Sequence, residues 1–387
     1  MRATQRTGMR IGRRELLLRA AGVLTQVILP AAAQSEATME ATQRRAALVP
    51  RPVRKTRIFH SGEGFGPVIN LGGLTDSTLV KRGNRWWLYL AGFDRRRGML
   101  NLWSASLPAG KPLAGEGWSI TTIPGDPHTA MELAPPSEPG SWDGSGGRHC
   151  PSYVRGWDPQ LHSGAGGWQE RIYYAGSAGG FGGPYSIGFL AWEGDRWARH
   201  DDGPVFAATE QWEANSVFEP NLVYHDGRWR MWYAAGPDAS GNVAQGYAES
   251  RDGRTNWQRR VFWPAKDNVF DQSVLAANGR FEAVLAIHTL GKPASRAGLW
   301  WMRAHGPVAN DAGWSEPVLL LNPFDGTPWH DMGVWKPSIQ YSDTDPKRLF
   351  IFFDGASRIS AEVAAARRGM PFDLTLGCLE CELSLRS

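Results

Sequence analysis

The stretch FEPNLVYHDGRWRMWYAAG, residues 218–236, has the pattern of a β-hairpin with an acid at its start. Two short apolar runs flank Asp226-Gly227, and such a dipeptide supplies the positive φ angles that tight antiparallel turns need. Glu219 and Pro220 come directly before the first run. The position of Glu219 raises the question of what a carboxylate faces at the start of a buried hairpin.

Four other stretches share this skeleton of a polar start, an alternating run, a turn and an apolar run, and such internal repeats indicate a repeated architecture. They are residues 75–92, 149–177 with an insertion after residue 157, 270–287 and 335–355. Third strands are predicted at residues 100–107, 185–194, 242–250, 298–305 and 357–366. Fourth strands are marked by Trp118, Trp197, Trp257 and Trp314, with residues 371–376 completing the fifth copy.

Four strands repeated five times predict an all-β chain that folds as a five-bladed β-propeller with four-stranded antiparallel blades. The 19 Trp and 46 Gly residues fit short aromatic strands joined by glycine turns. A β-sandwich with a second β domain explains the strands but not their recurrence. A single blade cannot bury both of its faces, so we expect most Trp side chains to pack between blades.

Residues 1–33 have the composition of an export signal of the twin-arginine type, cut after Ala33. This predicts a periplasmic or secreted protein. A membrane-anchored N-terminal helix is the alternative, but the apolar run is shorter than the about 20 residues that a span needs. We expect residues 34–55 to be a flexible linker and residues 56–387 to be one propeller domain. The basic residues of the segment are Arg2, Arg6, Arg10, Arg13, Arg14 and Arg19.

The formal net charge of +4 arises within that N-terminal segment, which holds six Arg and one acid, so the rest of the chain is close to neutral. Nucleic acid is therefore not an expected partner, and neither is a membrane after signal removal. The chain has three cysteines, Cys150, Cys378 and Cys381. We expect at most one disulfide, between the last two, and no redox role.

One aligned position stands at the start of the innermost strand in every copy. In a propeller these starts meet at the rim of the central channel, and ionisable groups gathered at a cavity commonly mark a functional site. Two carboxyl groups that face each other across a groove are the catalytic groups of most glycoside hydrolases. The alternative is a set of strand-end salt bridges with Lys336 as a partner. The aligned residues are Asp76, Cys150, Glu219, Asp271 and Lys336.

These residue types predict different roles for the two carboxylates. Asp76 is short and suits the general base. Glu219 follows Phe218 and lies near Trp212 in the sequence, and apolar neighbours keep a carboxyl group protonated, which suits the general acid. Asp271 is the third candidate catalytic acid.

A second regularity precedes three of the innermost strands. A Trp followed by a polar residue stands eight or nine residues before Pro151, Pro220 and Pro337. These pairs either form loops at the channel mouth that bind sugar, or place Trp in the blade seams while their neighbours cap turns. The first interpretation gives a predicted substrate-binding set of Asp143, His149, Trp212, Glu213, Trp329, His330 and Lys336.

These motifs, TDSTLV, FEPNLVYHDGRWRMWYAAG and WKPSI, resemble those of glycoside hydrolase families 43 and 32 across residues 57–376, and family 43 more closely. The resemblance implies an inverting mechanism with Asp76 as base and Glu219 as acid. The second-blade Asp that tunes the acid in family 43 does not match, because Cys150 stands there beside His149. Either Asp143 or Asp271 replaces it, or the chemistry has changed.

The resemblance also implies a calcium ion near a fifth-blade His, for which His330 or His288 is the candidate; no other cofactor is expected. The predicted function is therefore hydrolysis of a glycosidic bond in an oligo- or polysaccharide. Three alternatives stay open: a carbohydrate-binding propeller without catalysis, a phosphorylase or transferase on the same scaffold, and a purely structural interaction propeller.

Overall fold

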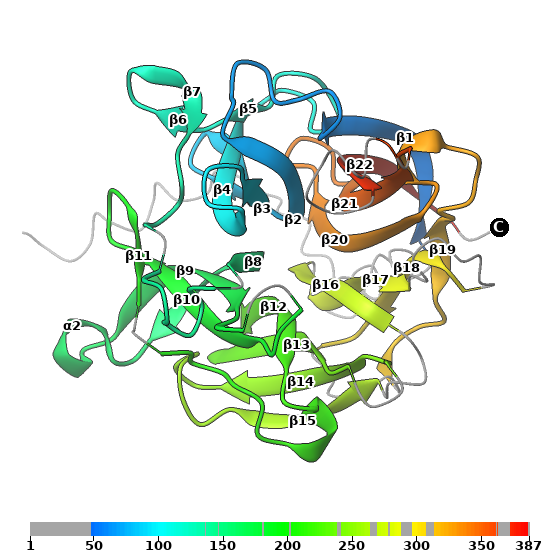
Figure 1. Ribbon diagram of the computed structural model, residues 1–387. Coiled ribbons are helices and arrows are strands. Elements are labelled where there is room, and N and C mark those ends of the chain that lie inside the picture. The colour runs from blue at the N-terminus through cyan, green and yellow to red at the C-terminus, as the bar shows by residue number, and fades with distance from the viewer. Residues whose placement is uncertain are drawn as a thin grey trace, which may run out of the picture. The chain divides into compact units, whose positions relative to one another are not determined.

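A computed structural model describes residues 48–135, 137–145, 147–179, 182–200, 203–237, 241–263, 269–277, 279–287, 296–306, 313–360, 362 and 372–385. Val49–Leu385 form one compact unit. Five four-stranded sheets surround a common centre, and consecutive strands within them pair antiparallel, so the predicted all-β five-bladed propeller is confirmed (Figure 1). The predicted export signal lies outside the described residues. Within the described part, no helix has the length and apolar character to cross a membrane.

The blades follow one another along the chain (Figure 1). Blade 1 consists of β2 (Leu71–Arg82), β3 (Arg85–Asp94), β4 (Met99–Pro108) and β5 (Ser119–Ile120). Blade 2 consists of β8 (Arg148–Asp158), β9 (Gly167–Gly176), β10 (Ser186–Trp192) and β11 (Trp197–Arg199). Blade 3 consists of β12 (Val217–His225), β13 (Arg228–Ala235), β14 (Ala244–Ser250) and β15 (Gln258–Trp263).

Blade 4 consists of β16 (Val269–Ala277), β17 (Arg280–Ile287), β18 (Gly298–Ala304) and β19 (Val318–Leu321). Blade 5 consists of β20 (Gly333–Tyr341), β21 (Arg348–Arg358), β22 (Phe372–Leu385) and β1 (Leu48–His60). The connections carry the small β6 (Thr122–Ile123) and β7 (Asp126–Ala130) ribbon and the short α2 (Leu161–Gly164), η1 (Gln211–Glu213) and η4 (Pro328–His330).

Blade 5 differs from its sequence-based prediction. Its third strand is β22 rather than residues 357–366, and its fourth strand is β1 rather than residues 371–376. The predicted linker is therefore wrong for residues 48–55, which belong to β1; residues 34–47 lie outside the described residues. Because β1 lies beside β22 in the sheet, strands from the two ends of the propeller segment close the ring.

Each seam between neighbouring blades holds its own apolar core. Trp103 of blade 1 and Phe352 of blade 5 share one core cluster, for example, and four further clusters fill the other seams. The two C-terminal cysteines are divided between two of these clusters, with Cys378 in the seam toward blade 1 and Cys381 in the seam toward blade 4. They lie on opposite faces of β22 and are free thiols, so the structure does not contain the disulfide considered for them.

The hairpin predicted for residues 218–236 is present. Asp226 and Gly227 have φ angles of 50° and 69° and connect β12 to β13, with His225 paired to Arg228. Positive φ at both central residues defines the mirror-image turn that matches strand twist. Asn278, in the corresponding predicted turn of blade 4, lies outside the described residues.

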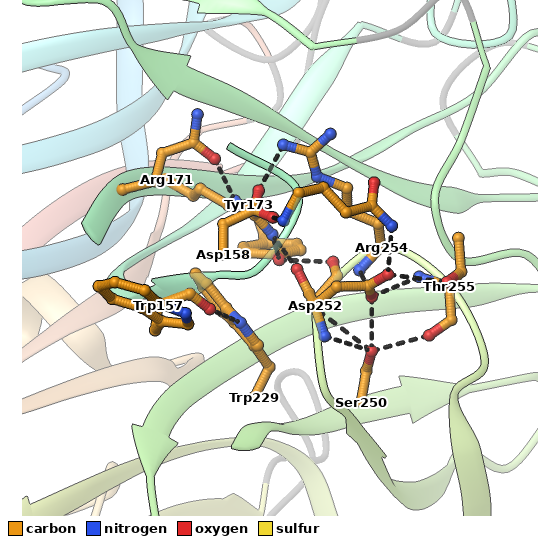
Figure 2. A network of polar contacts seen from close by, with 12 residues as sticks. Trp157, Asp158, Arg171, Tyr173, Trp229, Ser250, Asp252, Arg254 and Thr255 are labelled. Carbon is orange, nitrogen blue, oxygen red and sulfur yellow. Dashed lines mark hydrogen bonds and ion pairs between the residues drawn. The ribbon is translucent and has the colours of Figure 1, made fainter. Parts of the chain in front are cut away.

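A buried polar network joins blades 2 and 3 (Figure 2). Asp158, at the end of β8, is fully buried and pairs with both Arg171 of β9 and Arg254 from the loop after β14. Asp252 in the same loop accepts the backbone N–H groups of Arg254 and Thr255 at 2.8 and 2.9 Å. This network fixes the β14–β15 loop of blade 3 against the β8–β9 hairpin of blade 2.

We expect Asp158→Ala to lower the free energy of unfolding by about 3–5 kcal/mol, because the change leaves the guanidinium groups of Arg171 and Arg254 without their shared counter-ion. Chemical denaturation of purified protein measures this. Glu193→Ala is the matched control, since its pair with Arg196 is exposed and should contribute about 0–1 kcal/mol. Equal losses in the two variants would contradict the role of Asp158.

Candidate active site

Four of the five innermost strands carry the same β-bulge at the position that the repeats aligned. In β2, Asp76 and Ser77 both lie opposite Leu90, since the pairing shifts between Thr75 and Thr78. Two residues against one define a bulge, which bends the strand and re-aims a side chain. Equivalent shifts occur in β8, β12 and β20.

The first residue of each of these bulges has a left-handed backbone without being glycine. Such residues cost of order 1–3 kcal/mol each and are concentrated at functional sites. A proline follows three of them, which a bulge tolerates because the position needs no ladder N–H. The φ angles are 52° for Asp76, 53° for Cys150, 50° for Glu219 and 46° for Lys336.

The bulges bring four of these side chains into direct contact. The Cys150 thiol donates to Oε1 of Glu219 at 2.9 Å and lies 3.5 Å from Oδ2 of Asp76. Lys336 Nζ lies 2.6 Å from Oε2 of Glu219. His149 Nδ1 lies 2.5 Å from Cys150 Sγ. The predicted convergence of residues from blades 1, 2, 3 and 5 is therefore present, and so is the ion pair between Glu219 and Lys336 that the alternative interpretation expected.

Carboxylates also fix the backbone of the neighbouring blade. Asp76 accepts the N–H of Cys150 at 3.1 Å, and both oxygens of Asp271 accept the N–H of Lys336 at 2.9 and 2.8 Å. Asp354 of β21 accepts the N–H of Asp76 at 2.6 Å. These bonds satisfy the N–H groups that the bulges remove from the ladders, and they hold the side chains in place.

Burial and charge set the protonation of this cluster. Burial raises the pKa of Cys150 well above its usual value, and the charges of Asp76 and Glu219 raise it further, so the thiol is neutral. Burial lowers the pKa of His149 despite the nearby Asp76, so its ring is neutral too. Burial disfavours the Lys336 ammonium, but Glu219 and the other acids outweigh it and raise the pKa of Lys336.

The exposed fractions separate residues that can touch a ligand from those that cannot. Asp76 is 7% exposed, His149 6%, Glu219 5% and Lys336 3%, whereas Asp271 is fully buried. Burial, followed by the charge of Glu219, raises the pKa of Asp271 well above its usual value. Asp271, predicted as a catalytic acid, therefore lies behind the reactive surface and positions the backbone of Lys336.

Asp354 is a member of the cluster that sequence reasoning missed. It is fully buried and also accepts the hydroxyl of Thr75 at 2.7 Å. Burial and then the charge of Asp76 raise its pKa well above the usual value. The sequence contains a signal for it, because the other four blades have Ala at this strand position. Those residues are Ala91, Ala175, Ala234 and Ala286.

Three of the predicted substrate-binding residues bind within their own blades instead. Asp143 accepts from Tyr174 at 2.8 Å and from Arg199 of β11 at 2.6 Å. Glu213 accepts from Tyr233 at 2.7 Å and pairs with Arg259 of β15 at 3.0 Å. His330 lies 2.9 Å from Lys55 of β1. In each case the residue after Trp meets a basic residue of the outermost strand.

The preceding Trp rings pack on the second strand of the same blade. Trp142 stacks on Tyr174, Trp212 lies against Tyr233, and Trp329 stacks on Phe353. The three rings pack against the seam clusters, as the interpretation with Trp residues in the blade seams expected, while their neighbours bind basic residues of the outermost strands. Trp212 contacts Tyr233 rather than the Glu219 carboxylate, whose neighbours are the Cys150 thiol and the Lys336 ammonium.

His330 does not offer a ligand atom for the calcium ion implied by the resemblance. Its Nδ1 lies 3.0 Å from the carbonyl of Pro323 and its Nε2 faces the Lys55 ammonium, which repels cations. His288, the other candidate, lies outside the described residues. Metal-ligating atoms do meet elsewhere, at Asp76, His149 and Cys150.

Burial, and secondly Lys55, lower the pKa of His330. The folded protein therefore binds this proton less tightly than the unfolded chain does. We expect the free energy of unfolding to fall as pH drops below about 6.5, by at most about 1.4 kcal/mol per pH unit from this group. Denaturation of wild type and His330→Gln between pH 5 and 8 checks this. The prediction is wrong if the difference between the two proteins does not change with pH.

We call Asp76, His149, Cys150, Glu219 and Lys336 the channel cluster. A cavity of about 890 Å³ lies between blades 1 and 2, and none of these residues lines it. Trp87, Tyr153 and Trp192 are among its lining residues. The residues of the channel cluster are at most 7% exposed. The ring of Tyr185, just before β10, packs edge-on against His149 with 4.6 Å between ring centroids.

Several glycoside hydrolases of known structure share this propeller fold. No family model and no curated protein sequence matches this chain. A family 117 glycoside hydrolase of the marine bacterium Zobellia galactanivorans superposes with a TM-score of 0.55 at 12% identity, covering 87% of this chain and 91% of that one.

Two α-L-arabinofuranosidases are also similar in structure. The catalytic domain of the GH62 enzyme of Coprinopsis cinerea has a TM-score of 0.53 at 13% identity, with 86% of this chain and 98% of that one covered. The enzyme of Lactobacillus brevis has a TM-score of 0.52 at 11% identity, with 82% and 94% covered. These likenesses confirm the predicted resemblance to glycoside hydrolase propellers at the level of the fold.

Proposed function

We propose that this protein is a glycoside hydrolase whose active site lies in the channel cluster, with Asp76, Glu219 and Lys336 as the acting residues. The observation that carries the proposal is the set of left-handed bulges, which direct side chains from four blades to one point at the expense of backbone strain. Fold alone does not give function. The site contributes two carboxylates, 7% and 5% exposed, and two carboxyl groups are the minimum that glycoside hydrolysis needs.

In this proposal Asp76 is the general base and Glu219 delivers the proton to the leaving oxygen. The ion pair between Glu219 and Lys336 holds that proton on the ammonium in the free protein, and Glu219 passes it on when the leaving oxygen gains charge. The apolar surroundings that the sequence suggested do not reach the Glu219 carboxylate, which contacts the Cys150 thiol and the Lys336 ammonium.

The separation of the two carboxylates bears on stereochemistry. Both Asp76 Oδ2 and Glu219 Oε1 contact Cys150 Sγ, at 3.5 and 2.9 Å, so their distance lies at or below the lower limit of the about 6.5–9.5 Å that inverting enzymes need. We propose inversion, as the resemblance implies, with a sugar-bound state in which Glu219 leaves the thiol. Proton NMR of freshly released sugar reads the anomer, and a retained product would show that the pair acts at its present spacing.

A binding propeller without catalysis is the second candidate, favoured by Cys150 in place of an acid and by the low exposure of the channel cluster. Incubation with aryl glycosides and plant or bacterial polysaccharides separates the two. The names of two structural neighbours make arabinofuranosides the first substrates to test. Sugar release supports the hydrolase, whereas saturable binding without release supports the binding protein. We also propose export of the protein, which would bring it to such polysaccharides.

A further inference from the structure

The side chains of Asp76, His149 and Cys150 place three metal-ligating atoms of different types together within the channel cluster. Oδ2, Nδ1 and Sγ all lie within 4.8 Å of one another, and all three residues are buried. We propose that these residues form a binding site for a thiophilic divalent cation such as Zn²⁺. This site differs in residues and ligand types from the calcium position that the resemblance implied.

The distances between the three atoms fit a tetrahedral ion with only one adjustment. Bonds of about 2.0–2.3 Å at tetrahedral angles separate neighbouring ligand atoms by roughly 3.3–3.8 Å. The Sγ–Oδ2 distance is 3.5 Å and the Nδ1–Oδ2 distance is 3.8 Å. The Nδ1–Sγ distance of 2.5 Å must lengthen by roughly 1 Å, which small rotations of the two adjacent side chains provide.

The polar surroundings of His149 point to a ligand at this place. Its Nε2 is buried and has no hydrogen-bond partner among the described residues. When the ring carries its proton on Nε2, Nδ1 presents its lone pair toward Cys150 Sγ, where a cation would bind. In the metal-free cluster, in contrast, the imidazole and the Cys150 thiol lie against each other at 2.5 Å.

The charge of the cluster also suits a divalent cation. Metal binding would release the Cys150 thiol proton to water. Asp76, Glu219 and the resulting thiolate then contribute three negative charges, and Lys336 contributes one positive charge. A divalent ion brings the sum to zero. Oε1 of Glu219 lies 2.9 Å from Cys150 Sγ and is available as the fourth ligand. The thiolate selects Zn²⁺ or Co²⁺ over Ca²⁺ and Mg²⁺, which prefer oxygen ligands.

The scaffold around the site is already organised. The left-handed bulges hold Asp76 and Cys150, and the backbone N–H groups of these residues donate to Asp354 and Asp76. Rigid placement of ligands by their surroundings is what metal sites require. One consequence rests on the proposed function: a cation bound to Asp76 removes the base, so metal binding and hydrolysis exclude each other.

Co²⁺ titration of the chelator-treated full chain tests the site without any sugar. We expect one equivalent of Co²⁺ to bind with a thiolate-to-cobalt absorption band in the near ultraviolet, and Zn²⁺ to displace it. Cys150→Ser should lose the band and at least about 100-fold in affinity, and His149→Gln at least about tenfold. Cys378→Ser, at a buried cysteine of another core cluster, should keep the band. Absence of the band in wild type, or its persistence in Cys150→Ser, overturns the proposal.

Activity measurements then separate this proposal from the hydrolase. If the band forms but neither metal-free nor metal-loaded protein releases sugar, the metal site stands and the hydrolase fails. If metal-free protein releases sugar and no band forms, the hydrolase stands and the metal site fails. If Zn²⁺ stops sugar release and a chelator restores it, both are supported. Equal activity of the loaded and free forms overturns the mutual exclusion.

Discussion

Glu219→Gln should reduce the rate of sugar release by about 10²–10⁴-fold, the usual contribution of a general acid. Gln keeps the size of Glu and one oxygen, which can accept from either the Cys150 thiol or Lys336, but it cannot deliver a proton. The loss should therefore depend on the leaving group. We expect it to be largest for natural glycosides and smallest for aryl glycosides with acidic phenols, whose departure needs little protonation. Initial rates across such a series measure this.

Glu213→Gln is the matched control for that experiment. Glu213 is a second glutamate of blade 3, fully buried and bound to Tyr233 and Arg259 rather than to the channel cluster. It was also a predicted substrate-binding residue, so the variant tests both interpretations. We expect a lower free energy of unfolding with a rate near that of wild type. The assignment of Glu219 fails if its variant keeps a rate within tenfold of wild type on every substrate, or if Glu213→Gln loses as much activity while still folded.

The channel cluster was predictable from the sequence because three of the four bulges have a proline at their second position. The proline after the bulged residue occurs in three copies, and aligning the copies on it places Cys150, Glu219 and Lys336 in one column. The repetition then implies convergence, because equivalent positions in a closed ring of blades face the same centre. No single copy carries that information.

The ion pairs of Asp143 and Glu213 with the outermost strands were not predictable in the same way. Asp143 and Glu213 resemble loop acids at a channel mouth until their partners are known. Those partners, Arg199 and Arg259, stand on the outermost strands, some 46–56 residues further along the chain. Outermost strands are short and variable, so their register against the loops cannot be read from local pattern. Sequence reasoning therefore found the polar residues but not what they bind.

The closure of the ring was hidden for a related reason. β1 pairs with β22, more than 300 residues away, and Lys55 of β1 donates to Asp325 and Thr327 across a similar distance. Residues 34–55 are rich in Ala, Arg, Gln and Glu, a composition that predicts a linker, and residues 48–55 have no copy elsewhere in the chain that would mark them as a strand. The segment from residue 333 to residue 385 supplies three strands of blade 5, and β1 is its fourth strand.

Removal of β1 should abolish the folded state. A chain that starts at residue 61 lacks the fourth strand of blade 5 and the side chains of Ile58 and Phe59, which pack against a core cluster. It also exposes the edge of β22, a strand of 14 residues, and long unpaired edges promote aggregation. We expect this chain to be insoluble or to unfold without a cooperative transition, as measured by circular dichroism and size-exclusion chromatography.

A chain that starts at residue 48 is the matched comparison, because it keeps β1 complete. We expect it to be soluble and to unfold cooperatively. A synthetic peptide of residues 48–60 added during refolding of the shorter chain should restore part of the soluble fraction, since an added strand can complete an open sheet edge. The closure role of β1 is wrong if the chain from residue 61 unfolds at the same denaturant concentration as the chain from residue 48.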